Sequence, residues 1–337
     1  MRRLAGEAGF TLVELLIAVA LTGVVSLAVF QLFSTQERAF SIQDQVGEMQ
    51  QNVRVTMEMI TRDARMAGYK ISASFAIAVY NNVAAGNIVD GSGVTVGTNA
   101  KAGTDAVTFS YVDGNSPTYA VNTPGGSMTA ANFTICVEDA YITGNNINAS
   151  FPYQVGTVVG VYSTGGFQFI QITQTSTPGG PGCNAGYTKV KMNFSPGQSP
   201  INLPGGIDDI CNGNCNNPQP ILAEMITRTY FVDNTNQLMV SQPVAGGGYN
   251  PQPLAENIED LQLHYFLSGG GESDAPTTAQ IANIQQIRVN VLGRTARQDD
   301  RVANFTQTAI EDGVAQGPDG YRRRLLTSRV KVRNLGL

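Results

Sequence analysis

The chain has 337 residues, 14% of them charged, with 37 glycines, a single histidine, no tryptophan and a formal net charge of −5. Such a glycine-rich, weakly charged composition is typical of an extracellular, β-rich protein, and the length excludes more than one large or two small globular domains beside a long helix. The charge is uneven, because residues 70–287 hold 5 basic against 14 acidic side chains and residues 288–337 hold 10 basic against 5 acidic ones. This asymmetry favours complementary contacts within or between chains.

The first element, residues 9–33, is an apolar run whose one charged residue is Glu14. Residues 15–36 carry no charge at all, which is enough for a helix to cross the roughly 30 Å hydrocarbon core of a membrane. Arg2 and Arg3 precede the run, so the positive-inside rule predicts that residues 1–9 stay in the cytoplasm and the rest of the chain is exported. The run is therefore expected to anchor the chain in a membrane.

The motif Gly9-Phe10-Thr-Leu-Val-Glu14 opens this run. It resembles the cleavage and methylation motif of type IV prepilins. The resemblance implies that a prepilin peptidase removes the leader 1–9 by cutting between Gly9 and Phe10, that Phe10 becomes N-methylated, and that Glu14 makes an assembly contact with the terminal amine of a neighbouring subunit. A plain single-pass anchor is the less favoured alternative.

The apolar pattern continues beyond the uncharged run as a stripe with spacings of three and four, typical of one face of a helix. The stripe consists of Ile42, Val46, Met49, Val53, Met57, Ile60, Ala64 and Ala67. No proline interrupts it, and Gly68 is a natural stop. We predict one helix over residues 10–68, about 85 Å long at 1.5 Å per residue, with a transmembrane and assembly segment at 10–34.

Residues 69–337 form a predicted β-rich globular region, which gives an α+β fold with a pilin-like long N-terminal helix. Strands are predicted at 107–112, 133–137, 155–162, 167–173, 187–194, 227–232, 237–240, 258–267, 287–292 and 325–334, and a short helix at 276–284. Glycine-rich and asparagine-rich loops are predicted at 86–103, 113–130, 174–186 and 195–220. The region divides into two expected subdomains, a variable one at 69–220 and a C-terminal one at 221–337.

Four cysteines, Cys136, Cys183, Cys211 and Cys215, all follow the predicted anchor. An even number on the oxidising side of a membrane indicates disulfides, with three connectivities open. Cys211 and Cys215 could close a small loop, in which case Cys136 pairs with Cys183. A four-thiolate zinc site is the weaker alternative, because it usually needs two tight pairs of cysteines and this chain has one.

The sequence lacks the common enzyme motifs. The sequence shows no phosphate-binding loop and no nucleophile elbow, and His264 alternates with Leu263 and Tyr265 as a structural or solvated histidine would in a strand. Asp208 and Asp209, followed by several asparagines, lack the spacing of a calcium-binding loop. We therefore expect no catalysis, cofactor or metal.

The basic C-terminal segment contains Arg322 to Arg324 and a strand on which Arg329, Lys331 and Arg333 share one face. This face suits a solvated surface or docking to an acidic neighbour. Binding to DNA phosphates is the weaker alternative, since Tyr321 is the only nearby aromatic residue that could stack on bases.

Four further segments resemble minor pilins of the PilW type: the helix ending Arg65-Met-Ala-Gly-Tyr69, and the strands at 258–265, 287–292 and 330–334. This resemblance implies a subunit that sits in the inner membrane with its C-terminal region in the periplasm and then joins the extracellular pilus. There it would prime assembly and occupy the tip, with other minor pilins, the major pilin and in some cases a tip adhesin as partners. Alternatives are a J-type minor pseudopilin of a type II secretion system, or a tip adhesin or DNA-binding subunit.

Overall fold

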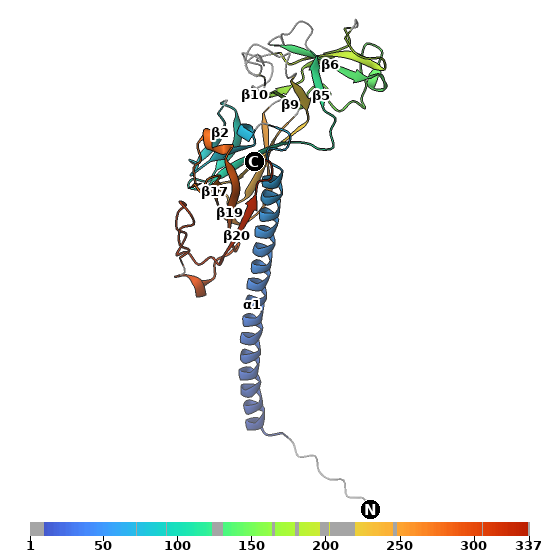
Figure 1. Cartoon of the computed structure of the whole chain (residues 1–337). Helices are drawn as coiled ribbons and strands as arrows, with labels where there is room; N and C mark the ends of the chain where they lie inside the picture. The colour runs from blue at the N-terminus through green and yellow to red at the C-terminus, as the bar shows by residue number, and fades with distance from the viewer. Residues whose placement is uncertain are drawn as a thin grey trace, which may run out of the picture. The chain divides into compact units, whose positions relative to one another are not determined.

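The structure is a computed structural model that describes residues 10–71, 73–91, 93–122, 131–163, 166–178, 182–195, 202, 220–244, 248–304 and 306–335. The chain divides into two compact units, residues 1–48 and 49–337. The described part of the first unit is helical from Leu12 onward. The second combines the last turns of the same helix with a set of antiparallel sheets (Figure 1).

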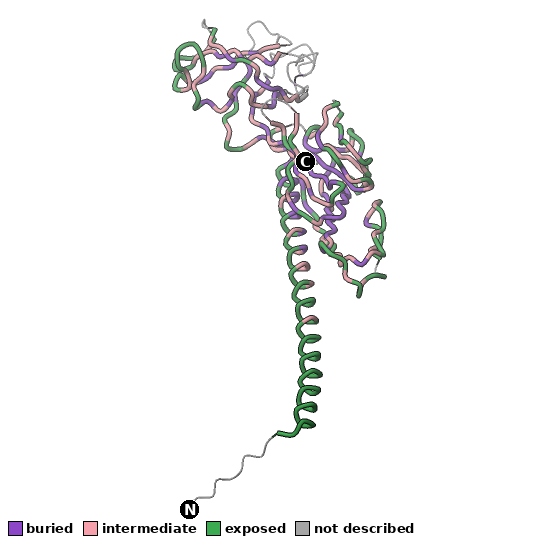
Figure 2. Tube along the Cα trace, turned by 180° about the vertical axis from the view of Figure 1, so that it is seen from behind, coloured by how far each residue is buried: buried purple, intermediate pink, exposed green. Residues whose placement is uncertain are grey.

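Helix α1 spans Leu12–Met66 without interruption, as the proline-free sequence predicts. Its buried residues all lie in the second unit, where they recur at spacings of three and four. They are Met49, Val53, Thr56, Met57, Ile60, Thr61, Asp63 and Ala64. Figure 2 shows the same change along the helix, from exposed residues in its first part to buried ones toward its C-terminal end. The long helix and the β-rich region together confirm the predicted fold class.

The helix ends where Gly68 adopts a left-handed backbone, with φ of +81°. A Cβ at this position would lie 3.0 Å from Leu335 and 3.3 Å from Ala76, so glycine meets both the conformational and the packing requirement. The side chain of Asn334 donates to the carbonyl oxygens of Met66 and Ala67, both at 3.2 Å. The C-terminal end of the chain thereby caps the last turn of α1.

A glycine also allows the helix to approach the sheet closely. Gly293 lies in β19 (Ile284–Arg294), and a Cβ built on it would be only 2.3 Å from Val53 and 3.2 Å from Met49. Beside this contact, the Asn52 side chain donates to the carbonyl oxygen of Glu256 at 3.0 Å. Any side chain at position 293 would push the strand away from α1.

A buried carboxylate fixes the helix against the sheet. Asp63 accepts hydrogen bonds from the hydroxyl groups of Tyr111 at 2.9 Å and Tyr230 at 2.7 Å, and from Arg228 Nη1 at 3.1 Å to both carboxylate oxygens. Its side chain is 1% exposed and that of Arg228 is 20% exposed. Burial and the neighbouring Asp63 raise the pKa of Tyr111 to about 12, so its phenol stays protonated and donates.

Two sheets form the part of the second unit that packs on α1. The five-stranded sheet has the order β1 (Ile77–Tyr80), β4 (Ala106–Val112), β14 (Met225–Val232), β15 (Leu238–Pro243) and β16 (Tyr249–Ala255). The four-stranded sheet has the order β18 (Glu272–Ser273), β17 (Ile258–Leu267), β19 and β20 (Arg323–Lys331). Because β4 pairs with β14, strand pairing crosses the boundary expected at residue 220.

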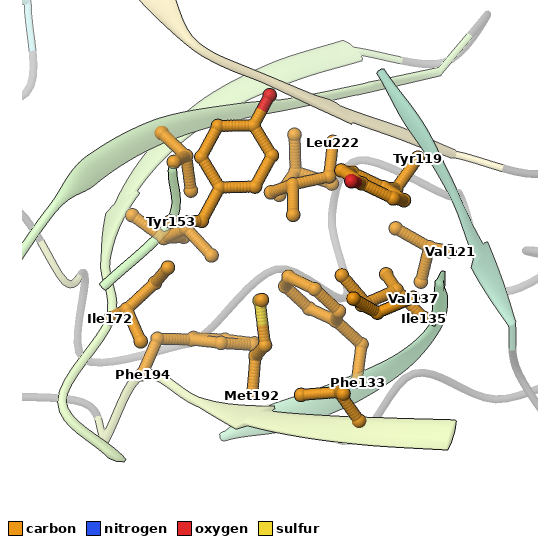
Figure 3. Packing of buried hydrophobic residues seen from close by; sticks show 14 of the residues in the cluster. Tyr119, Val121, Phe133, Ile135, Val137, Tyr153, Ile172, Met192, Phe194 and Leu222 are labelled. Carbon is orange, nitrogen blue, oxygen red and sulfur yellow. The ribbon is translucent and has the colours of Figure 1, made fainter. Parts of the chain in front are cut away.

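A seven-stranded sheet occupies the sequence between β4 and β14. Its order is β10 (Gly166–Gln171), β9 (Val158–Ser163), β13 (Ile221–Ala223), β5 (Tyr119–Asn122), β6 (Asn132–Glu138), β12 (Tyr187–Asn193) and β11 (Gln174–Ser176). It has its own apolar core, in which the labelled side chains are directed toward one another between the strands (Figure 3). The rings of Tyr119, Phe151 and Tyr153 lie 5.5 to 5.8 Å apart in this core.

The chain enters this sheet at residues 113–117 and leaves it at Glu224, and these two segments, called the neck below, are hydrogen-bonded to each other. The backbone amide of Asp113 donates to the carbonyl oxygen of Glu224 at 3.0 Å, and Ser116 Oγ donates to the Glu224 carboxylate at 2.5 Å. The Tyr153 hydroxyl group accepts from the Glu224 amide at 3.1 Å and donates to the carbonyl oxygen of Pro117. The two ends of the inserted segment therefore lie side by side.

Several predicted loops contain strands, and these predictions were wrong. The 86–103 segment folds into the hairpin of β2 (Gly86–Val89) and β3 (Thr95–Ala100), and β5 and β11 lie in the loops predicted at 113–130 and 174–186. Most of the loop predicted at 195–220 lies outside the described residues. Long-range pairing and packing determine these strands, which the local composition does not show. The predicted helix at 276–284 is the single turn α2 (Thr278–Ile281). The remaining short elements are β7 (Ile142–Thr143), β8 (Asn146–Ile147) and 3₁₀ turns at Ala73–Phe75, Asp139–Tyr141 and Asp300–Val302.

We predict that Gly293→Ala destabilises the second unit by about 1–3 kcal/mol, the usual cost of forcing an extra methyl group into a filled contact. The measurement is thermal unfolding of the full chain in detergent micelles. Gly91→Ala is the matched control, because a Cβ there has nothing within 4 Å and its unfolding temperature should stay unchanged. Equal effects of both variants would contradict the close approach of β19 to α1.

We predict that Asp63→Asn lowers the free energy of unfolding by about 3 kcal/mol, the low end for breaking a buried ion pair, since part of Arg228 stays exposed. Chemical denaturation of the full chain in micelles measures the change. Asp44→Asn, on an exposed face of the same helix, serves as the control. Adding Arg228→Met to the Asp63→Asn variant should recover part of the loss; no recovery would mean that the unpaired guanidinium is not its cause.

Candidate assembly site

The start of α1 holds the residues that the sequence assigns to processing and assembly. Gly9 lies outside the described residues, whereas Phe10 is 83% exposed. Thr11 and Glu14 bind each other reciprocally: the Thr11 amide and hydroxyl group both donate to Glu14 Oε2 at 2.9 Å, and the Glu14 amide donates to Thr11 Oγ1 at 3.3 Å. This is a capping box, which satisfies backbone donors that the first turn would otherwise leave open.

The role of Thr11 is absent from the sequence prediction, although a signal for it exists. Thr11-Leu-Val-Glu14 fits the threonine-x-x-glutamate pattern that precedes an apolar helix. Glu14 thus has a hydrogen-bond partner inside its own chain. The resemblance to prepilins, in contrast, implies a partner in a neighbouring subunit. Any contact with another chain must compete with this cap or coexist with it.

The helix surface that follows is apolar and open. Helix α1 contains a stretch that is long and apolar enough to cross a membrane. No part of this stretch is buried within the chain. Large apolar side chains are exposed all round this segment, among them Leu16, Val24, Phe30 and Phe33. A helix that is apolar on every side is stable only when something outside the chain covers it.

Cys136 and Cys183 form a disulfide, with a Cα–Cα distance of 5.6 Å. This is the pairing that the sequence leaves open for them, and it joins β6 to the segment before β12 in the seven-stranded sheet. Sulfur atoms in a disulfide are not thiolate ligands, so the four-cysteine zinc site is incompatible with this state. Cys211 and Cys215, and the acidic pair Asp208 and Asp209, lie outside the described residues.

Part of the basic C-terminal segment is neutralised within the chain. Arg322 pairs with Asp299 at 2.6 Å, while Arg323 pairs with Glu259 at 2.5 Å and with Asp319 at 2.6 Å. These contacts neutralise two of the ten basic residues of this segment within the chain.

The three cations expected on one face are all exposed and alternate with the buried side chains of Val330 and Val332. Arg329 and Lys331 are exposed on β20, with the Arg329 guanidinium carbon 3.6 Å from the ring centroid of Phe266. Arg333 is exposed but lies beyond the strand, which ends at Lys331 rather than at residue 334. The strand therefore offers two cations and the turn after it a third.

Two family models match the ends of the chain. Residues 4–30 match the prokaryotic N-terminal methylation motif, and residues 229–334 match the family described as type IV pilus-assembly protein W. A type IV-like pilin from Thermus thermophilus is similar over 88% of this chain and 98% of its own, with 10% identity and a TM-score of 0.34. No curated protein matches.

The methylation motif covers the capping box and the open apolar surface, and the second match runs from β14 to the segment that caps α1. Helix, motif and matched region are consistent with membrane anchoring and pilus assembly. The chain therefore carries a prokaryotic N-terminal methylation motif at residues 4–30 and a PilW-type region at residues 229–334.

Proposed function

We propose that a prepilin peptidase cuts this chain between Gly9 and Phe10 and that the mature protein helps to prime the type IV pilus and sits at its tip. Before assembly it lies in the inner membrane as a single-pass protein with its C-terminal region in the periplasm. Its partners are the peptidase, the other minor pilins, the major pilin and a tip adhesin. The role is structural rather than catalytic.

The open apolar surface of α1 carries this proposal. Lipid chains cover such a surface in a membrane, and apolar faces of neighbouring helices cover it equally well in a filament. The same segment thus serves storage and assembly, and transfer from one to the other exchanges one apolar environment for another. Little free energy is then needed to extract the helix if other helices receive it at once.

Glu14 favours transfer of the helix from lipid to the filament, because its carboxylate can bind the terminal amine of a neighbouring chain. In the chain by itself its carboxylate caps the first turn, which offsets part of the cost of placing a charge near lipid. Cleavage before Phe10 creates a free amine four residues away, and a neighbouring chain carries the same amine. A carboxylate that already accepts two hydrogen bonds still has lone pairs on its second oxygen for that neighbour.

The size of the β-rich region supports the proposed placement at the tip. Residues 69–337 form a large body relative to the helix, with the seven-stranded sheet inserted between β4 and β14. A large domain is hard to repeat in a tight helical array but is tolerated at an end, where neighbours lie on one side.

We predict that Glu14→Gln and Glu14→Ala both reduce incorporation into filaments by about tenfold or more, as loss of one charge-assisted contact of ~1.5 kcal/mol implies. Immunoblots of sheared filaments against membrane fractions measure the ratio. Membrane levels should stay the same, because the apolar run is intact.

Two comparisons separate the charge from the cap. Glutamine at the third helical position still completes a capping box, whereas Thr11→Ala removes the cap and leaves the carboxylate. Normal incorporation of Glu14→Gln together with loss in Thr11→Ala would show that Glu14 acts through the cap alone, and would refute the intersubunit contact.

We predict that mass spectrometry of sheared pili finds this chain at a small fraction of the major subunit, beginning with a methylated Phe10. Deleting its gene should reduce pilus number and twitching while exoprotein secretion continues. Loss of secretion with normal pili would instead identify a minor pseudopilin. Stoichiometry close to that of the major subunit would exclude the tip.

A further inference from the structure

Titratable side chains from several elements converge on His264, the chain's single histidine. His264 lies in β17 and is 9% exposed. Its Nδ1 atom is 2.5 Å from Asp274 Oδ1 and 3.8 Å from Glu311 Oε2, and its Nε2 atom is 3.0 Å from Glu272 Oε2. Nδ1 and one oxygen each of Asp274 and Glu311 all lie within 4.8 Å of one another.

Each of these groups is held by a partner on its far side. Glu272 accepts from Nε2 of the imidazole, which directs Nδ1 toward the other two carboxylates. Glu311 is held by Arg288, whose Nε donates to Oε1 at 2.7 Å and whose Nη2 donates to Oε2 at 2.9 Å, and by Asn290, which donates to Oε1 at 2.9 Å. Its Oε2 atom lies 3.8 Å from His264 Nδ1 and retains a second lone pair. Metal-binding histidines and carboxylates are commonly oriented by outer partners of this kind.

We propose that His264 Nδ1, Asp274 and Glu311 bind a divalent transition-metal ion of the Zn²⁺ class. One nitrogen and two carboxylate oxygens are ligands that Zn²⁺ accepts, and they leave a position for water or a fourth ligand. The side chains of Asp274 and Glu272 are 32% and 56% exposed, so an ion can enter from solvent.

A proton on each imidazole nitrogen satisfies two of the three carboxylates, because Nδ1 then bonds Asp274 and Nε2 bonds Glu272. Glu311 Oε2, at 3.8 Å from Nδ1, lies beyond hydrogen-bond distance. An ion that replaces the Nδ1 proton and separates Nδ1 from Asp274 would contact Asp274 and Glu311 at once. Arg288 offsets the charge of Glu311 but leaves Glu272 and Asp274 facing one imidazole.

Binding would join three parts of the PilW-matched region. His264 belongs to β17, Asp274 follows β18, and Glu311 lies in the segment of residues 295–322 that connects β19 to β20. Glu311 adopts φ of +50°, a conformation that is uncommon for residues other than glycine. The next residue, Asp312, accepts hydrogen bonds from the side chains of Asn81 and Asn82. A bound ion would give the connection of residues 295–322 a second attachment beside this one.

Zinc binding by the full chain tests the proposal. The protein is purified in detergent micelles with a histidine-free affinity tag and without reductant, treated with EDTA, dialysed and titrated calorimetrically with ZnCl₂. One Zn²⁺ per chain should bind and raise the unfolding temperature. His264→Ala and Asp274→Asn should abolish both effects, and Asp300→Asn, an exposed acidic residue on the same connection, should change neither.

Two further measurements keep the test independent of how the variants fold. Glu272→Gln should weaken binding by about tenfold to a hundredfold without changing its stoichiometry, as expected for a positioning residue. In wild-type protein labelled with ¹⁵N only in its one imidazole, Zn²⁺ should shift the Nδ1 resonance more than that of Nε2. Absence of stoichiometric binding, or binding that leaves Nδ1 unshifted or survives His264→Ala, would overturn the proposal.

Discussion

One uninterrupted helix has to satisfy two environments, and the rest of the structure depends on this constraint. Residues 12–33 expose apolar side chains on every side, whereas from Met49 onward only one stripe is apolar and buried. The sequence of α1 offers neither proline nor a glycine that leaves the helical conformation, so both parts are made of regular helix.

The attachment of those turns combines apolar packing with one polar contact of defined geometry. An apolar stripe alone tolerates sliding by a turn, since residues four apart present similar surfaces. Asp63 removes that freedom, because its carboxylate meets Tyr111, Tyr230 and Arg228 in only one register. The close approach of Gly293 to Val53 adds a second restriction nearer the middle of the helix. Both ends of the docked segment are thus fixed, which a filament subunit needs if its β-rich region is to keep one position on its helix.

The sequence predicts the elements that depend on local pattern and misses those that depend on distant partners. The uncharged run, the stripe, the stop at Gly68 and the alternating strands are visible in single segments. The hairpin β2–β3 is not visible in this way, because Gly97 by itself is typical of a loop. In the structure a Cβ on Gly97 would lie 2.9 Å from the Phe231 ring, so the glycine allows this ring to pack against the strand. Asp63 was missed although a charged residue within an apolar stripe is itself a signal. The groups around His264 come from segments up to 47 residues apart, and no motif joins them.

The neck between β4 and β14 explains why the recognisable parts of the chain lie at its ends. Asp113 and Glu224 are hydrogen-bonded neighbours, so a segment of any length can be inserted between them without disturbing the pairing of β4 with β14. The closure cost of a long insertion rises only slowly with its length. The seven-stranded sheet has its own apolar core and disulfide. Its sequence can therefore change while the five-stranded and four-stranded sheets keep their contacts with α1. The family match begins at residue 229, just after the chain returns through this neck, and the intervening sequence shows no motif. The two matched regions thus lie in the helix and in the sheets that pack on it, whereas most of the inserted sheet lies outside both matches.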